Sequence, residues 1–197
     1  MEKILNVPNV ISGLRLASVP VLAVFMFTGN IEGFKWLLLA ALLSDIADGW
    51  IARKFNLQTS FGSALDSLAD LSTYLAVITS IFVFQRQFLM AQALPIAIFI
   101  ALFIGEKVKC AFEYGRPFNS FHNYSAKLMA YSQGIFIMTL YFFGCQWFIF
   151  YPAFAIGVWA NIEDIIMTSI VKRGSHDTKG LFWVLKPANR AMLKRGI

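Results

Sequence analysis

The chain has 197 residues, of which 58% are hydrophobic and only 14% are charged, whereas ordinary soluble domains carry about 25% charged residues. This composition excludes a typical water-soluble domain, and the 20 Phe residues exclude a disordered chain. The net charge of +6 does not indicate nucleic acid, because membrane orientation and anionic lipids also select basic residues beside apolar spans. We therefore expect one membrane domain over residues 1–197 and no nucleic-acid partner.

The first ten residues predict a short helix in the membrane interface, in front of the first span. Apolar and polar residues are interspersed there, as a segment lying at the surface of a bilayer requires. The apolar set is Ile4, Leu5, Val7 and Val10, and the polar set is Glu2, Lys3, Asn6 and Asn9.

Six stretches are long and apolar enough to cross a bilayer, which takes roughly 17 to 25 residues. They predict an all-α integral membrane protein with six transmembrane helices, over residues 10–28, 34–52, 62–84, 88–108, 126–143 and 148–171. Residues 172–197 follow as a tail, whose apolar run at 181–185 fits the inner leaflet of the membrane.

Basic residues are distributed unequally between the two sides of this layout. Cytoplasmic segments of membrane proteins are enriched in Lys and Arg, so the richer side predicts cytoplasmic termini and a cytoplasmic active site in an inner or plasma membrane. Cys110 and Cys145 then lie on opposite sides and cannot pair. Of the 17 Lys and Arg residues, only Lys35 and Arg86 fall on the poorer side; the rest are Lys3, Arg15, Arg53, Lys54, Lys107, Lys109, Arg116, Lys127, Lys172, Arg173, Lys179, Lys186, Arg190, Lys194 and Arg195.

Four acidic residues lie at the cytoplasmic ends of the second and third predicted spans: Asp45, Asp48, Asp66 and Asp70. Residues three or four apart share a helix face, so each helix projects a pair of carboxylates. Because carboxylates in a membrane are costly, they are by default functional or tightly paired. Oxygen ligands without His or Cys suit Mg²⁺ or Mn²⁺. The structural alternative is that Arg53, Lys54 and neighbouring helices merely neutralise the four acids.

The same segment resembles the signature of the CDP-alcohol phosphatidyltransferase family, Asp-x2-Asp-Gly-x2-Ala-Arg-x8-Gly-x3-Asp-x3-Asp. It matches without a gap, at Asp45, Asp48, Gly49, Ala52, Arg53, Gly62, Asp66 and Asp70. The six-span layout and the early Pro8, Asn9 and Arg15 are also similar to that family.

The resemblance implies a transferase of phospholipid biosynthesis that moves a phosphatidyl group from CDP-diacylglycerol to a small alcohol and releases CMP. It implies two Mg²⁺ or Mn²⁺ ions held by the four aspartates, with Asp70 also acting as the catalytic base. It further implies that Gly49, Ala52, Arg53 and Gly62 bind the nucleotide of the donor. A homodimer is a further implication of the family.

Basic residues on the predicted cytoplasmic side suit a phosphorylated acceptor such as glycerol 3-phosphate. The candidates for binding it are Lys107, Lys109, Arg116 and Lys127, although each alone also fits a topology signal. Phosphatidylglycerophosphate synthases carry Gly-Lys-x-Lys-Thr-x-x-Gln at the start of the fifth span; here Lys127 and Gln133 match, whereas the second Lys and the Thr are replaced. Inositol phosphate, serine and other alcohols therefore remain alternatives.

Three polar residues stay without an assignment: His122, Glu163 and Asp164. A non-catalytic ion-binding or transport protein is the alternative of another class. It would place acids near the middle of the bilayer on interrupted helices with internal repeats, whereas these acids cluster at one end of two helices and no repeat is visible.

Overall fold

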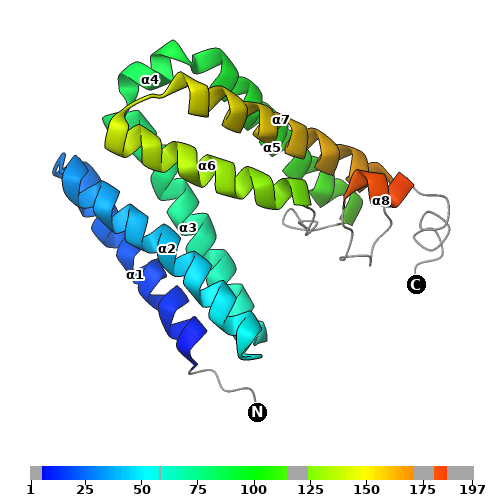
Figure 1. Ribbon diagram of the computed structural model, residues 1–197, viewed down its shortest axis with the longest axis horizontal. Helices are drawn as coiled ribbons and strands as arrows, with labels where there is room; N and C mark the ends of the chain where they lie inside the picture. Colours follow the sequence, from blue (N-terminus) through cyan, green and yellow to red (C-terminus); the bar gives the residue numbers. More distant parts are fainter. Residues whose placement is uncertain (1–5, 58, 115–123, 171–179, 186–197) are drawn as a thin grey trace. The chain divides into compact units, whose positions relative to one another are not determined.

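The structure is a computed structural model that describes residues 6–57, 59–114, 124–170 and 180–185, and these are almost entirely helical. The chain divides into two compact units, Met1–Ala91 and Gln92–Ile197. Figure 1 shows the helices of each unit, coloured along the chain from blue at the N-terminus to red at the C-terminus.

The first unit contains α1 (Val7–Phe27), α2 (Ile31–Lys54), α3 (Ser60–Phe84) and the short α4 (Arg86–Ala91). Helix α1 packs against both α2 and α3. The interior of the first unit includes the fully buried Leu22, Phe34 and Leu38. The centres of the Phe34 and Phe84 rings lie 5.4 Å apart. The start of α2 therefore lies beside the end of α3, so these two helices run in opposite directions.

Polar caps begin the three long helices of this unit. The side chains of Asn6, Asn30 and Thr59 accept hydrogen bonds from backbone N–H groups three residues later, each at 2.9 Å. Such caps satisfy donors that have no partner in the first turn of a helix. Between α1 and α2, Gly29 has a φ of 70°, which lets the chain reverse within three residues.

The second unit contains α5 (Ala93–Tyr114), α6 (Tyr124–Phe143), α7 (Trp147–Ile170) and α8 (Leu181–Leu185). Helix α7 is central, because it contacts α5, α6 and α8. Cys110, Met167 and Val184 form a buried apolar cluster where α5, α7 and α8 meet. Cys110 and Cys145 do not form a disulfide with each other. Burial raises the pKa of Cys145, in the α6–α7 connection, above its ordinary value.

Among the described residues, three helices are long and apolar enough to cross a membrane: α1, α3 and α7. Large apolar side chains face outward on them and on their neighbours; Phe27 is 90% exposed and Phe112 is 87% exposed. Outward-facing apolar side chains of this kind suit a lipid environment rather than water. The helices α2, α5 and α6 have 24, 22 and 20 residues, and their crossing of the membrane stays a prediction.

Two expectations about helix boundaries need correction. The expected interfacial helix is not separate over its described part, because Val7 and Val10 already belong to the continuous helix α1; residues 1–5 lie outside the described residues. The expected span at 88–108 is broken at Gln92, between α4 and α5. Pro95 explains the break, since it has no N–H to donate to the carbonyl of Ala91 and therefore suits only the first turn of a new helix.

Candidate active site

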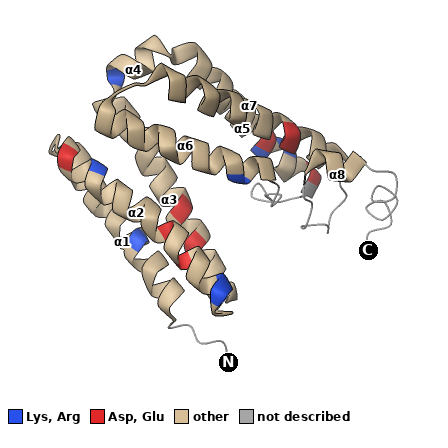
Figure 2. Cartoon of the chain, in the orientation of Figure 1, with Lys and Arg blue, Asp and Glu red and all other residues tan. Residues whose placement is uncertain are grey.

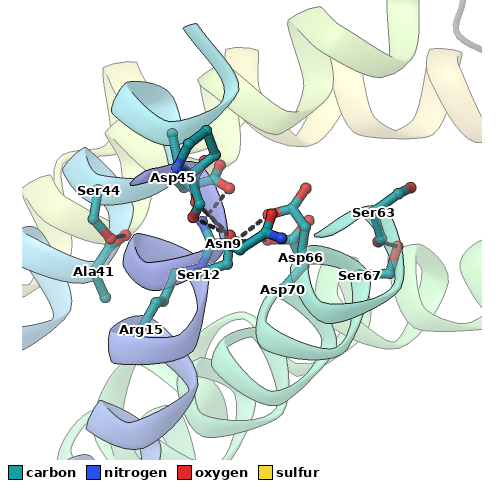
Figure 3. A network of polar contacts seen from close by, with 12 residues as sticks. Asn9, Ser12, Arg15, Ala41, Ser44, Asp45, Ser63, Asp66, Ser67 and Asp70 are labelled. Atoms are coloured by element: carbon teal, nitrogen blue, oxygen red, sulfur yellow. Dashed lines mark hydrogen bonds and ion pairs between the residues drawn. The ribbon is translucent and has the colours of Figure 1, made fainter. Parts of the chain in front are cut away.

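The four aspartates of the signature converge in the first unit, on one face of α1. Asp45 and Asp48 lie in the second half of α2, and Asp66 and Asp70 lie in the first half of α3. Figure 2 shows these acidic residues beside a basic residue of α1, and Figure 3 shows the contacts between them. The two carboxylate pairs therefore lie together in this unit, one pair from each helix.

The basic residue is Arg15, whose side chain is only 1% exposed. Its two terminal nitrogens point in different directions: Nη1 binds Asp45 on α2, and Nη2 binds Asp66 on α3. Asp70 Oδ1 lies 3.2 Å from Nη2, and Asp48 Oδ2 lies 3.7 Å from it. One guanidinium thus links both halves of the signature.

Ser12 lies one turn before Arg15 and is also buried. Its hydroxyl lies 2.9 Å from Asp48 Oδ2 and 3.1 Å from the carbonyl oxygen of Pro8. Because residues three apart share a helix face, Ser12 and Arg15 present a donor and a cation to the same group of acids. We call these two residues the polar face of α1.

The four carboxylates differ in exposure. Asp48 is enclosed, with 4% of its side chain exposed, whereas Asp45, Asp66 and Asp70 are 44%, 43% and 55% exposed. The cluster is therefore closed toward α1 at Asp48, whereas its other three carboxylates are partly exposed.

This arrangement fits divalent cations. One carboxylate oxygen from each of Asp45, Asp48 and Asp66 lies within 4.8 Å of the other two. Asp70 lies outside this group of three but shares the Arg15 contact. The all-oxygen donor set of these carboxylates suits Mg²⁺ or Mn²⁺.

Gly62 is needed where α1 packs against the start of α3. A Cβ atom there would lie 2.2 Å from Asn9 Oδ1 and 2.8 Å from Thr59 Oγ1, which are impossible distances. Asn9 Nδ2 in turn donates to Thr59 Oγ1 at 3.3 Å. The structure thus gives this signature glycine a packing role, and its contact with a nucleotide stays a prediction.

Gly49 differs, because the nearest atoms to a Cβ there would be those of the Arg53 guanidinium, at an ordinary 3.5 to 3.8 Å. Packing within the described residues therefore does not require this glycine, and its expected role in leaving room for a ligand stays a prediction. Arg53 is exposed and Ala52 is half-buried, both in the last turn of α2. Their predicted contacts with the donor nucleotide stay predictions.

The residues predicted to bind an acceptor lie in the second unit, and two have partners there. Lys107 Nζ lies 2.7 Å from Glu106 Oε2, and Lys109 Nζ donates to the carbonyl oxygen of Ile165 at 3.0 Å and contacts Ser169. Lys127 is exposed on α6. Arg116 lies outside the described residues. Their role in acceptor binding stays a prediction.

Of the three unassigned residues, Glu163 has a clear structural partner. It is buried on α7, and its Oε1 accepts a 2.6 Å hydrogen bond from the backbone N–H of Leu181, the first residue of α8. Asp164 is half-buried beside it, and His122 lies outside the described residues.

In the sequence, Arg15 stands out only as a basic residue on the richer side and as a point of resemblance to the family, and nothing marks Ser12. The available signal was the cost of an arginine inside an apolar helix, which requires a nearby carboxylate. The spacing of Ser12 and Arg15 also puts both polar groups on one face. Only the fold, however, shows which acids lie opposite.

Comparison with known proteins agrees with this geometry. A family model for CDP-alcohol phosphatidyltransferases matches residues 5–159. Proteins named CDP-diacylglycerol–glycerol-3-phosphate 3-phosphatidyltransferase are similar: that of Rickettsia bellii is 43% identical over 68 residues, 33% of this chain and 38% of its own, and that of Aquifex aeolicus is 41% identical over 66 residues, 34% of this chain and 37% of its own. A Schizosaccharomyces pombe protein named cardiolipin synthase (CMP-forming) / mitochondrial hydrolase fusion protein is 38% identical over 69 residues, 35% of this chain and 12% of its own.

The matched family region covers most of the chain and contains the whole cluster of aspartates. The chain therefore belongs to the CDP-alcohol phosphatidyltransferase family. The alignments with the Rickettsia relatives span only 38% of the length of those proteins. No solved structure gives a significant match.

Proposed function

We propose that this protein is an integral-membrane phosphatidyltransferase that moves a phosphatidyl group from CDP-diacylglycerol to a small alcohol and releases CMP. The observation that supports this most directly is the convergence of the four signature aspartates at a site where three of their side chains are partly exposed. Such a site holds the polar headgroup of the donor, while its acyl chains remain beside the apolar helices.

In this proposal the acceptor hydroxyl oxygen attacks the phosphorus that bears the diacylglycerol. A new P–O bond forms, the bond to the CMP phosphate oxygen breaks, and CMP leaves. Asp70 takes the hydroxyl proton; its side chain has the largest exposed fraction of the four, at 55%, so an incoming alcohol can reach it. Arg53 contacts the donor phosphates, and Gly49 leaves room for the nucleotide.

Asp45, Asp48, Asp66 and Asp70 would hold two Mg²⁺ or Mn²⁺ ions. Bound divalent ions supply positive charge to the phosphate oxygens, which phosphoryl-type transfers need more than they need covalent help. Asp48 is fixed by Ser12, and Asp45 and Asp66 are fixed by Arg15, so the chain itself orients the ligand oxygens.

We propose glycerol 3-phosphate as the acceptor. Two of the relatives described above bear names that specify this acceptor, and the chain has Lys107, Lys109, Arg116 and Lys127 available for a phosphate. The S. pombe relative bears a different reaction name, so similarity alone leaves inositol phosphate, serine and other alcohols as alternatives. We further propose six membrane spans, cytoplasmic termini and site, and assembly as a homodimer.

The decisive assay measures CMP release from CDP-diacylglycerol by the full chain in detergent micelles. The acceptor panel contains glycerol 3-phosphate, inositol phosphate, inositol, serine and choline. We expect turnover with glycerol 3-phosphate that EDTA abolishes and Mg²⁺ or Mn²⁺ restores. If no acceptor releases CMP while vesicles containing the protein conduct ions, the transport alternative replaces this proposal.

Asp66→Asn should reduce turnover to background, because the amide keeps the shape but loses the charge that a divalent ion requires. Glu32→Gln is the matched control, since Glu32 is an exposed acid at the opposite end of α2 that pairs with Lys35 at 2.6 Å. The control should retain activity, and both variants should elute as folded protein. Full activity of Asp66→Asn, or of the wild type in EDTA, contradicts the metal site.

A further inference from the structure

We infer that the polar face of α1, formed by Ser12 and Arg15, is the positioning element that sets the divalent-metal affinity of the aspartate cluster. This inference rests on the metal site of the proposed function. The signature itself lies on α2 and α3, so α1 would contribute residues that orient the ligands without belonging to the signature.

Arg15 is suited to this role by its shape as well as its charge. Its guanidinium is a rigid fork, and the two ends reach different helices: Nη1 contacts Asp45 on α2, while Nη2 contacts Asp66 and Asp70 on α3. A lysine at this position offers one compact ammonium group and cannot hold both helices in this way. Arg15 therefore fixes the separation of the two carboxylate pairs.

Charge and position predict opposite effects on metal binding, so the two can be separated. If Arg15 acted only as a competing positive charge, its removal would strengthen the attraction of the cluster for a divalent ion. If it acts as a positioning residue, its removal lets four like charges move apart and weakens binding. The rigid guanidinium fork joins two helices, and its side chain is only 1% exposed, which favours the positioning role.

Ser12 supplies a second and milder handle on the same element. Its hydroxyl lies 2.9 Å from Asp48 Oδ2, and Asp48 is the enclosed member of the cluster, with 4% of its side chain exposed. Groups that hydrogen-bond to metal ligands commonly change metal affinity about 10-fold to 100-fold when they are removed. Loss of one hydroxyl is also compatible with folding.

The test measures equilibrium binding of Mn²⁺ to the full chain in detergent, with no substrate present. Electron paramagnetic resonance detects the Mn²⁺ that remains free. We expect Arg15→Lys and Arg15→Gln each to weaken binding by about 10-fold or more. Ser12→Ala should weaken it by a smaller factor of about 3-fold to 10-fold, because it frees one carboxylate. Thermal unfolding identifies any variant that fails to fold. If the Arg15 variants do not fold, Ser12→Ala decides: weaker Mn²⁺ binding supports the inference, and wild-type affinity overturns it.

Two controls separate this role from general effects. Lys35→Gln removes a cation near the other end of α2, and Ser72→Ala removes a hydroxyl that, like Ser12, lies close to the carbonyl oxygen four residues earlier, at 2.7 Å from Leu68. Both should bind Mn²⁺ as the wild type does. Wild-type affinity in Arg15→Lys together with tighter binding in Arg15→Gln would overturn the inference and leave Arg15 as a simple counter-charge. Absence of Mn²⁺ binding by the wild type would instead refute the metal site of the proposed function.

Discussion

The two glycines of the signature differ in what a side chain at each position would contact, although the sequence motif presents them as equivalent. At Gly62, a Cβ atom would collide with Asn9 Oδ1 at 2.2 Å, so a larger residue would force Asn9 out of its place between α1 and α3. At Gly49, a Cβ atom would make only an ordinary contact with Arg53 at 3.5 Å. A motif residue can thus be fixed by the fold of the chain itself rather than by the ligand.

Gly62→Ala should lower the stability of the protein, by about 1 to 3 kcal/mol, because overpacking forces a side chain or a helix to move. Combining it with Asn9→Ala should cost less than the sum of the two single changes, since Asn9→Ala removes the nearest colliding atom. Thermal unfolding in detergent, compared across the four proteins of this cycle, measures the coupling.

Gly13→Ala is the control for this cycle, because a Cβ atom at Gly13 meets nothing within 4 Å and alanine favours a helix. It should leave stability equal or slightly higher. Simple additivity of Gly62→Ala and Asn9→Ala would show that the close approach of Asn9 is not what requires a glycine.

At the scale of single residues, the sequence predicted the cluster of aspartates but not the arginine that contacts all four of them. The spacing of Asp45, Asp48, Asp66 and Asp70 follows from helix periodicity, so their shared faces are visible without a structure. Arg15 lies 30 residues before Asp45 and 51 residues before Asp66, and periodicity carries no information over such distances. Its partners depend on how α1 packs against two other helices.

Among the elements, helix ends in the second unit have charged partners that the sequence does not reveal. Lys109 on α5 lies against the last turns of α7, where its cation faces carbonyl groups and the negative end of the helix dipole. Glu163 on α7 accepts from the first N–H of α8. The structure explains why these charged residues occur in an apolar region, because it shows their partners. The sequence shows only that the charges are there.

Some helix boundaries could be predicted from the sequence, and one could not. Long apolar runs predicted α1, α2, α3, α6 and α7 to within about three residues, an accuracy that pattern reasoning allows. Hydropathy did not predict the break at Gln92, because the residues on both sides are equally apolar. The break depends on a missing backbone donor at Pro95, which a hydropathy average does not register.

Glu163→Ala should release α8 from α7. The hydrogen bond from Leu181 N to Glu163 Oε1 is 2.6 Å long and involves a buried, charged acceptor, and such bonds contribute about 1.5 to 3 kcal/mol. Hydrogen exchange at the Leu181 amide should therefore become about 10-fold to 100-fold faster. Glu113→Ala, at an exposed acid on α5, should leave this amide unchanged. Unchanged exchange in Glu163→Ala would mean that the apolar contacts of α8, at Leu181, Trp183 and Val184, are enough to hold it.

For the whole molecule, the distribution of basic residues is the main evidence for the orientation of the chain in the membrane. Helix α1 has 21 residues and is therefore about 31 Å long, which matches a hydrocarbon core of about 30 Å. Arg15 lies eight residues from its start, or about 12 Å, and the α1–α2 turn at Gly29 lies at its opposite end. Within the first unit, the aspartate cluster and this turn are thus far apart along α1.

We expect both termini to be cytoplasmic and the turn at Gly29 to lie outside, because all but Lys35 and Arg86 of the 17 basic residues fall on the predicted cytoplasmic side. A protease site or a single labelled cysteine is placed at either terminus or in the turn, in a protein whose Cys110 and Cys145 are replaced by alanine. In sealed right-side-out vesicles, the turn should react with an impermeant reagent, and the termini should react only after the membrane is opened. Those two cysteine replacements without an added site serve as the control for background labelling. Labelling of a terminus from outside would reverse the orientation, and it would place the partly exposed carboxylates of the aspartate cluster away from the cytoplasm.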